Sequence, residues 1–161
     1  MDAEALEFIR RNSGLTLDAQ GQFHSAGVRV ANDRVQALFH RNLDVRENGD
    51  VTLTLGEVWA YVNTEAVARF VTVLRRNEDL LNISFLDGRS VESDDPRICA
   101  GPDNRLYLWE APDAYPSVLL RSAHSALAEL LEERDRRIGF QLGDKWVEVT
   151  QLEKSPGPSG R

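Results

Sequence analysis

The residues with the greatest capacity for chemistry are three histidines and one cysteine: His24, His40, His124 and Cys99. A metal site on a helix needs two histidines at positions i and i+4, and no pair of these histidines has that spacing. The chain also lacks a C-x-x-C pair, and nothing beside Cys99 resembles the local signature of a thiol nucleophile. We therefore expect separate surface or edge histidines, a buried structural thiol, no bound metal and no cofactor.

Phosphate-binding and calcium-binding loops are missing from the sequence as well. Neither G-x-G-x-x-G nor G-x-x-x-x-G-K-[ST] occurs. The acidic run Glu92–Asp95 carries oxygen ligands of the kind that Ca²⁺ prefers, but it lacks the spacing of a calcium loop, which favours a solvated turn. The sequence thus predicts no catalytic residue and favours a non-catalytic protein. The alternative is an enzyme of unrecognised type with a site between two halves of the chain.

Aromatic residues are the better candidates for binding a ligand or partner. Alternate residues of a strand face opposite sides, so Tyr107 and Trp109 share one side, and Arg121 is predicted on a neighbouring strand. Two rings and a guanidinium can hold a small ligand by stacking and charge. Trp59 faces away from the apolar side of its own predicted strand, where it either packs or lines a groove. An ordinary aromatic-rich sheet is the alternative interpretation.

These residues lie in a chain that repeats itself. The string L-G-acid-x-W-x-x-V occurs at Leu55–Val62 and again at Leu142–Val149. The segments before both copies have the same order of three strands, one helix and a strand pair, which predicts an internal duplication. Trp59 and Trp146 should therefore occupy equivalent positions.

Three helices interrupt the strands. Residues 2–12 predict a helix capped by Asp2, and a second helix begins at Asn32 or Asp33 with an apolar face that includes Leu38. A third helix is predicted to begin at the capping residue Ser122, and Leu127 lies at the centre of its apolar face. Residues 65–75 fit either a helix or a strand, and their β-branched side chains favour the strand.

The predicted fold class is α+β, with two related antiparallel-sheet-plus-helix units packed together. We expect five segments along the chain. They are an N-terminal helix (1–14), a first repeat unit (15–64), a connecting β-hairpin (65–96), a second repeat unit (97–150) and a flexible tail (151–161).

Four segments of the chain resemble a bacterial family of uncharacterised proteins, domain of unknown function 1285 (DUF1285). They are Gly21–Gly27, Val30–Phe39, Asn48–Leu53 and Pro116–Leu127. The chain departs from the family pattern at Phe23, where a Trp is expected, and at Ser117, where a Tyr is expected, so it resembles a diverged relative. The resemblance implies a repeated α+β fold and a regulatory or signalling role, and it implies no catalytic residue.

The charge balance narrows the classes of partner. The 161 residues include 26 acidic and 19 basic side chains, which gives a net charge of −7. Nucleic acids and anionic membranes both require clustered Lys and Arg, so neither is expected as a partner. The pair Arg10-Arg11 is expected to be solvated or to cap a helix. A single cysteine and the lack of a long apolar run predict a soluble, cytoplasmic protein. The expected partner is another protein or a small molecule.

Overall fold

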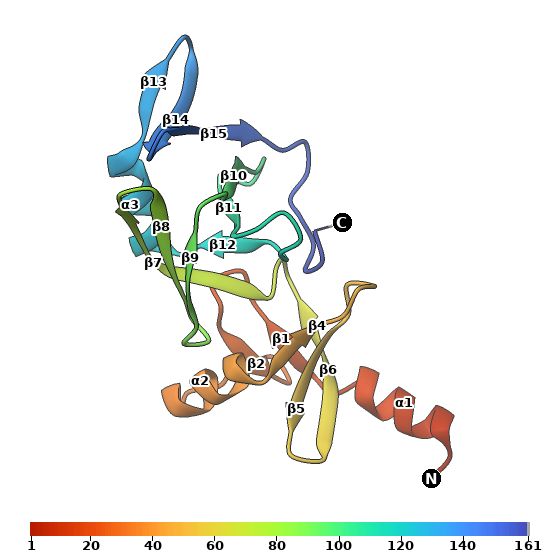
Figure 1. The fold of residues 1–161 in the computed structure, drawn as a ribbon. Coiled ribbons are helices and arrows are strands. Elements are labelled where there is room, and N and C mark those ends of the chain that lie inside the picture. Colours follow the sequence, from red (N-terminus) through yellow and green to blue (C-terminus); the bar gives the residue numbers. More distant parts are fainter. Residues whose placement is uncertain (161) are drawn as a thin grey trace. The chain divides into compact units, whose positions relative to one another are not determined.

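The structure, a computed structural model, describes residues 1–160 of the chain. The chain divides into two compact units. Unit 1 comprises residues 1–68 with the C-terminal segment from Gly157, and unit 2 comprises residues 69–156. The described residues form three helices and fifteen strands, arranged as a six-stranded sheet in unit 1 and a nine-stranded sheet in unit 2 (Figure 1). The predicted α+β class is confirmed. None of these three helices is long and apolar enough to span a membrane.

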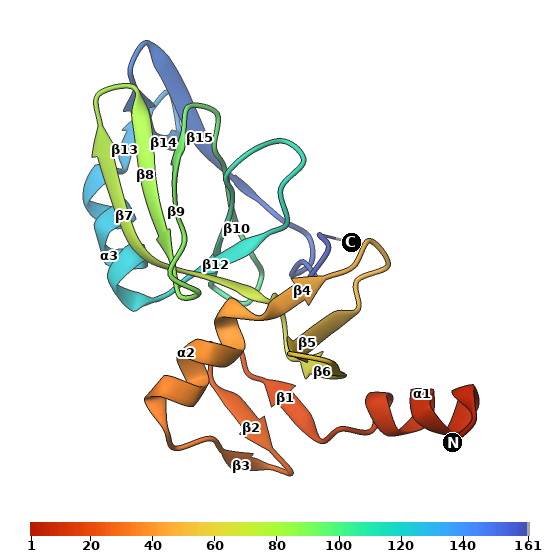
Figure 2. The same ribbon diagram turned by 60° about the horizontal axis from the view of Figure 1, so that its bottom comes forward.

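Unit 1 begins with helix α1 (Ala3–Arg11), and the side chain of Asp2 caps it by accepting a hydrogen bond from the backbone N–H of Ala5 at 2.7 Å. Asn32 caps helix α2 (Asp33–Arg41) in the same way, and α2 separates two groups of three strands (Figure 2). The strands are β1 (Leu15–Leu17), β2 (Phe23–Ser25), β3 (Val28–Arg29), β4 (Leu43–Val45), β5 (Val51–Leu55) and β6 (Val58–Thr64).

Helix α2 turns a polar pair toward the core of unit 1. Gln36 and His40 are buried, whereas Leu38, predicted on the core face, is 39% exposed. The Gln36 amide accepts a hydrogen bond from the Phe23 N–H at 2.8 Å and donates one to the Phe23 carbonyl at 3.0 Å. Burying an amide costs free energy unless it is hydrogen-bonded, and these two hydrogen bonds remove that cost. Apolar periodicity does not identify a buried polar residue such as Gln36, so the prediction that Leu38 lies on the core face was wrong.

Unit 2 contains nine strands and helix α3 (Arg121–Leu130). The strands are β7 (Arg69–Asn77), β8 (Leu80–Phe85), β9 (Ser90–Ser93), β10 (Arg97–Ala100), β11 (Leu106–Trp109), β12 (Ser117–Leu119), β13 (Glu132–Arg134), β14 (Arg137–Leu142) and β15 (Lys145–Gln151). The ambiguous segment is a strand from Arg69 onward. The segment 65–96, predicted as a connecting β-hairpin, contains the three strands β7, β8 and β9, which extend the sheet of unit 2.

Helix α3 lies along β7 and closes the core of unit 2 (Figures 1 and 2). Leu127 and Ala123 are fully buried in that core, as predicted. Ser122 does not cap the helix, because Leu120 occupies the N-cap position and makes no side-chain hydrogen bond there. The Ser122 hydroxyl instead donates to the carbonyl of Thr72 on β7 at 2.7 Å. The hydroxyl thus anchors the helix to the sheet.

The two units share one strand order. Unit 1 runs β3-β2-β1-β6-β5-β4, and the first six strands of the unit 2 sheet run β12-β11-β10-β15-β14-β13. In both, the first strand pairs in parallel with the last, β1 with β6 and β10 with β15, so the sheets are mixed and not purely antiparallel as predicted. Side-chain periodicity identifies strands but does not say which ones pair, and this parallel pair joins strands far apart in the sequence.

The repeated string forms the same turn in each unit. Gly56 and Gly143 both adopt φ +63°, a conformation that favours glycine, at the first position of a two-residue hairpin turn. Trp59 pairs with Thr54 across the first hairpin, and Trp146 pairs with Gln141 across the second. Each tryptophan is therefore the second residue after its turn, at the same register position.

Candidate functional site

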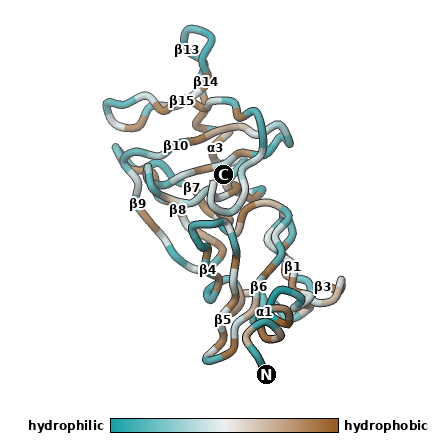
Figure 3. Tube along the Cα trace, turned by 90° about the vertical axis from the view of Figure 1, so that its right-hand side faces the viewer, coloured by the Kyte–Doolittle hydropathy of each residue, from teal (hydrophilic) through white to brown (hydrophobic). Residues whose placement is uncertain are grey.

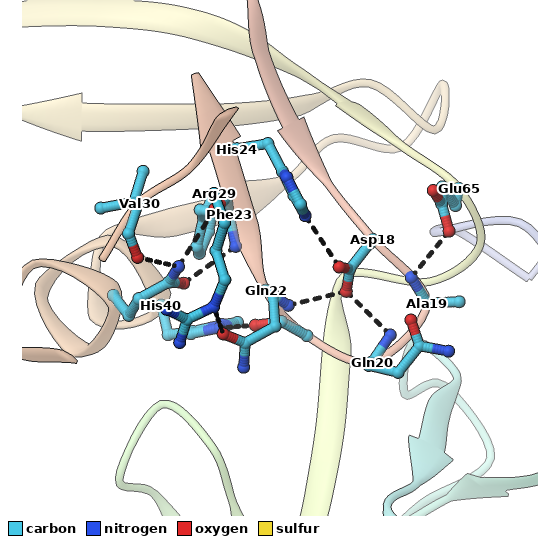
Figure 4. Close-up of polar contacts among 12 residues, drawn as sticks. Asp18, Ala19, Gln20, Gln22, Phe23, His24, Arg29, Val30, His40 and Glu65 are labelled. Atoms are coloured by element: carbon cyan, nitrogen blue, oxygen red, sulfur yellow. Dashed lines mark hydrogen bonds and ion pairs between the residues drawn. The ribbon is translucent and has the colours of Figure 1, made fainter. Parts of the chain in front are cut away.

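Asp18 and His24 form the acid–histidine pair that most resembles a catalytic group. Asp18 lies in the turn between β1 and β2, and its Oδ2 is 2.9 Å from His24 Nε2 (Figure 4). Its Oδ1 accepts hydrogen bonds from the N–H groups of Gln20 and Gln22, each at 2.9 Å. Burial alone would raise the pKa of Asp18, but the hydrogen bonds from His24 and the two N–H groups outweigh it and lower that pKa. The carboxylate is therefore held ionised.

Unit 2 contains a related pair in the equivalent turn, with a tyrosine in place of the histidine and with the aspartate two positions later in the turn. Tyr107 on β11 is the second residue after its turn, as His24 is on β2, and its hydroxyl donates to Asp103 Oδ2 at 2.6 Å. The backbone of the two turns matches as well. Asp18 N–H donates to the Gln22 carbonyl, and Gly101 N–H donates to the Arg105 carbonyl. His24 and Tyr107 thus each hold a turn in place through a hydrogen bond with an aspartate. Tyr107 is no base at neutral pH, so this role is structural.

The electrostatics of the second pair agree with this role. Burial raises the pKa of Tyr107, and the hydrogen bond to Asp103 raises it further. Burial would raise the pKa of Asp103 too, but the hydrogen bonds from Tyr107 and from the Arg105 N–H outweigh it and lower the pKa. Each carboxylate therefore stays charged and accepts hydrogen bonds. We call these two pairs, Asp18–His24 and Asp103–Tyr107, the turn locks.

The remaining histidines and the cysteine do not join a common site. His40 is buried and its Nε2 lies 2.7 Å from the Gly21 carbonyl (Figure 4). Cys99 is buried in unit 2, as expected, with its Sγ 3.2 Å from Thr150 Oγ1. His124 is exposed on α3. Within residues 1–160, no three side chains of the metal-binding types come together.

The three aromatic-site candidates of unit 2 do not form one exposed surface. Tyr107 is fully buried, and Trp109 is buried with the guanidinium of Arg97 over its ring, 4.5 Å from the centroid. Arg121 is exposed, and it is the first residue of α3 and not part of a neighbouring strand as predicted. Strand β12 ends at Leu119, two residues before Arg121.

The fourth candidate, Trp59, belongs to a cluster of three arginines and two aromatic rings. Trp59 and Tyr61 lie 5.3 Å apart on the same side of β6, and they face α1. Arg10 of α1 lies over Trp59, 4.0 Å from the ring centroid, and Arg11 lies over Tyr61 at 4.1 Å. Arg46, just after β4, approaches both rings, at 4.9 and 5.6 Å. We call these five residues the arginine–aromatic cluster.

Helix α1 is attached to the sheet through this cluster, and its apolar side faces outward. Phe8 is 68% exposed and Ile9 is 53% exposed, and no residue of the helix is buried. Figure 3 shows both hydrophobic and hydrophilic segments along α1. The pair Arg10-Arg11 was expected to be solvated or to act as a cap, and it turns out to be the docking element, because guanidinium groups stack well on aromatic rings.

A pocket of about 310 Å³ opens beside the cluster, within unit 1. Arg11, Asp50 and Tyr61 supply its charge and its ring, and Asn63 and Thr64 add polar groups. Pro158, from the C-terminal segment, forms part of the wall. A cation, an anion and an aromatic ring thus line one small, open pocket.

Unit 2 carries a partial counterpart of the cluster. The guanidinium of Arg134 lies over Trp146, 4.4 Å from the ring centroid. The strand register makes Arg134 the equivalent of Arg46, since each lies two residues beyond the matched pairs Asp44–Thr52 and Glu132–Gly139. A Cβ on Gly139 would come within 2.9 Å of the Trp146 ring, so the indole lies directly on this glycine. Glu148 replaces Tyr61, and the ring pair of unit 1 is not reproduced.

Known proteins resemble this chain in fold. No protein-family model matches the chain, and no curated protein matches it. Two solved structures resemble it. A DUF1285 family protein from Silicibacter pomeroyi DSS-3 aligns with a TM-score of 0.67 and 14% identity, over 87% of this chain and 81% of that one. The chain has the DUF1285 fold.

The second DUF1285 protein, from Shewanella baltica OS155, aligns with a TM-score of 0.52 and 16% identity, over 73% of this chain and 91% of that one. The predicted resemblance to DUF1285 is confirmed at the level of the fold, and the low identities are consistent with a diverged relative. The names of these two proteins state no activity. The function therefore has to be argued from the residues of this chain.

Sequence reasoning missed Asp18 and the three arginines of the arginine–aromatic cluster as interacting residues. For Asp18, one signal was present: an aspartate lies in each of the two equivalent turns, before His24 and before Tyr107. For Arg46, the register of β4, β5 and β6 is needed, because it brings Arg46 next to Trp59 and Tyr61, and for Arg10 and Arg11 the docking of α1 on β6 is needed.

Proposed function

We propose that the chain is a non-catalytic binding module and that the arginine–aromatic cluster with its adjacent pocket is the binding site. The single observation that supports this most is the pocket itself, in which Arg11, Asp50 and Tyr61 face one cavity. The other polar groups that could do chemistry have structural partners: His24 and Tyr107 act in the turn locks, and Cys99 contacts Thr150.

A regulatory role fits this proposal better than an enzymatic one. General acid–base catalysis needs a proton-exchanging side chain beside the bound molecule, whereas Asp18 and His24 pair with each other at a turn and neither lines the pocket. A binding site made of a stacked guanidinium and a carboxylate needs no proton transfer. The acidic net charge of −7 also fits a ligand other than a polyanion.

We also infer that the two units arose by internal duplication. The shared strand order, the two glycine turns at φ +63° and the matching backbone hydrogen bonds of the β1–β2 and β10–β11 turns support this origin. In an experimental structure, superposing residues 21–62 on 104–149 should place the Trp59 and Trp146 indoles on the same strand and side. Indoles on different elements would contradict the duplication.

A thermal-shift screen of small metabolites tests the binding function. Compounds that stabilise the wild-type chain should lose their effect in Arg11→Gln, because Arg11 lines the pocket. They should keep their effect in the matched control Arg34→Gln, which alters an exposed arginine of α2. Stabilising compounds that ignore Arg11, or any compound that the protein converts to a product, would contradict the proposal.

A further inference from the structure

We propose that the pocket beside α1 binds a small zwitterion that carries a carboxylate and an ammonium group a few bonds apart, as a free amino acid does. This inference rests on the proposed function and specifies the ligand class of the same site. The pocket offers a donor for the carboxylate, an acceptor for the ammonium group, and charges that reject ligands with one charge alone.

Arg11 is the donor for the carboxylate. Its guanidinium lies over Tyr61, and its Nε is engaged by Glu7 at 2.9 Å. Its Nη2 is 3.6 Å from Asp50 Oδ2, longer than the 2.7–3.2 Å typical of a hydrogen bond. A stacked guanidinium presents its remaining N–H donors at its edge, in the plane that suits a carboxylate. A ligand carboxylate at that edge gains closer bonds than Asp50 provides.

Asp50 is the acceptor for the ammonium group. A local turn holds it in place, because its backbone N–H donates to Asn48 Oδ1 at 3.0 Å and its Oδ2 accepts from Asn48 Nδ2 at 3.1 Å. The contacts of its side chain within residues 1–160 all use Oδ2. The second oxygen, Oδ1, is therefore available to an ammonium group. Tyr61 adds an aromatic ring beside the same charges.

The two opposite charges also explain which ligands the pocket excludes. A simple carboxylate gains Arg11 but meets the negative charge of Asp50, and a simple amine gains Asp50 but meets Arg11. Only a ligand with both charges satisfies both residues, so discrimination comes from repulsion as much as from attraction. A cavity of about 310 Å³ is at the small end of ligand sites, which suits a molecule of amino-acid size.

The C-terminal segment limits the length of the ligand. Gly157–Gly160 forms a turn, with the Gly160 N–H donating to the Gly157 carbonyl at 3.0 Å, and Pro158 contributes to the pocket wall. Gly49 forms another part of the wall, and a Cβ there would lie 3.3 Å from Ser159 Oγ. The close approach of these two segments favours a single small molecule over a peptide chain.

Calorimetry on the full-length chain tests the ligand class. A thermal-shift panel of the common L-amino acids selects the most stabilising one, and that amino acid is then compared with its N-acetyl derivative and its methyl ester. We expect each derivative, which lacks one charge, to bind at least about tenfold more weakly. Asp50→Asn should weaken the free amino acid by about tenfold and should tighten the N-acetyl derivative, because the charge that repels its carboxylate is gone. Arg11→Gln should weaken the free amino acid equally and should tighten the ester, because the charge that repels its ammonium group is gone.

Both substitutions alter partly exposed side chains, and a cooperative unfolding transition of the unliganded variant shows that it folds. Asp33→Asn, at an exposed aspartate of α2, is the matched control and should bind like the wild type. If the N-acetyl derivative binds as tightly as the amino acid and depends on Arg11, the ligand class is wrong and the binding function stands. If no amino acid in the panel stabilises the chain, the proposed class is also overturned. If stabilising ligands ignore both Arg11 and Asp50, the site itself is wrong.

Discussion

Removing the Asp18 carboxylate tests whether the Asp18–His24 pair is a turn lock. In Asp18→Ala, three hydrogen bonds disappear: those from the N–H groups of Gln20 and Gln22 and the one shared with His24. The side chain is only 19% exposed, so little water replaces these bonds. A hydrogen bond to a charged group contributes about 1.5–3 kcal/mol when well shielded, and partial exposure reduces the sum. We expect a loss of about 2–3 kcal/mol in the free energy of unfolding.

The effect of Asp18→Ala should depend on pH in a definite direction. The pKa of Asp18 is lowered from 3.8 in the folded chain, so its contribution is present above that value and is lost as the pH falls through the folded pKa. The difference between wild type and Asp18→Ala should therefore be full near neutral pH and shrink below about 3.8. Urea denaturation followed by tryptophan fluorescence measures it at each pH.

The matched control is Asp44→Ala, at an exposed aspartate of β4 for which no side-chain hydrogen bond occurs within residues 1–160. It should change the free energy of unfolding by less than about half a kcal/mol at any pH. Equal effects of Asp18→Ala and Asp44→Ala would refute the turn lock, and so would a difference that grows on acidification. A loss of some enzymatic turnover in Asp18→Ala at unchanged stability would favour the catalytic interpretation instead.

Further substitutions test the packing. Leu127→Ala, in the fully buried face of α3, should cost about 2–5 kcal/mol in urea denaturation, and a cost below half a kcal/mol would contradict the phase of the helix. Phe8→Ala should cost less than about 0.5 kcal/mol, because the ring is 68% exposed. Arg10→Ala removes the stack on Trp59 and should cost about 0.5–1 kcal/mol. A larger cost for Phe8→Ala than for Arg10→Ala would show that α1 docks by its apolar side. Gly139→Ala should cost about 1–3 kcal/mol, since its Cβ would collide with the Val147 carbonyl and the Trp146 ring, and a neutral melting temperature would refute this close packing.

Local features of the fold were predictable because they depend on neighbouring residues. The L-G-acid-x-W string identified both hairpin turns, since glycine at φ +63° and alternation along the strands leave a clear pattern. Asp2 was recognised as a cap by residue type alone. Ser122 was misassigned by the same rule, because residue type does not show that its hydroxyl reaches Thr72 on another strand.

The candidate site was less predictable because it depends on the orientation of whole elements. Periodicity shows which residues of α1 share a side, but not that the helix docks through Arg10 and Arg11 and leaves Phe8 outside. Trp59 was identified as a candidate from its side of the strand alone. Asp50 could not be, since its position next to Arg11 follows from the pairing of β5 with β6 and from the docking of α1 on β6.

The most direct test of the binding function is a ¹H–¹⁵N NMR titration of the labelled full-length chain with the amino acid that stabilises it most. We predict that the largest shifts occur at Arg11, Asp50 and Tyr61, and that Asp18 and His24 change little. Saturation should follow a single binding curve with no conversion of the ligand. Shifts centred on the Asp18–His24 pair, or loss of the ligand signal through reaction, would contradict the account.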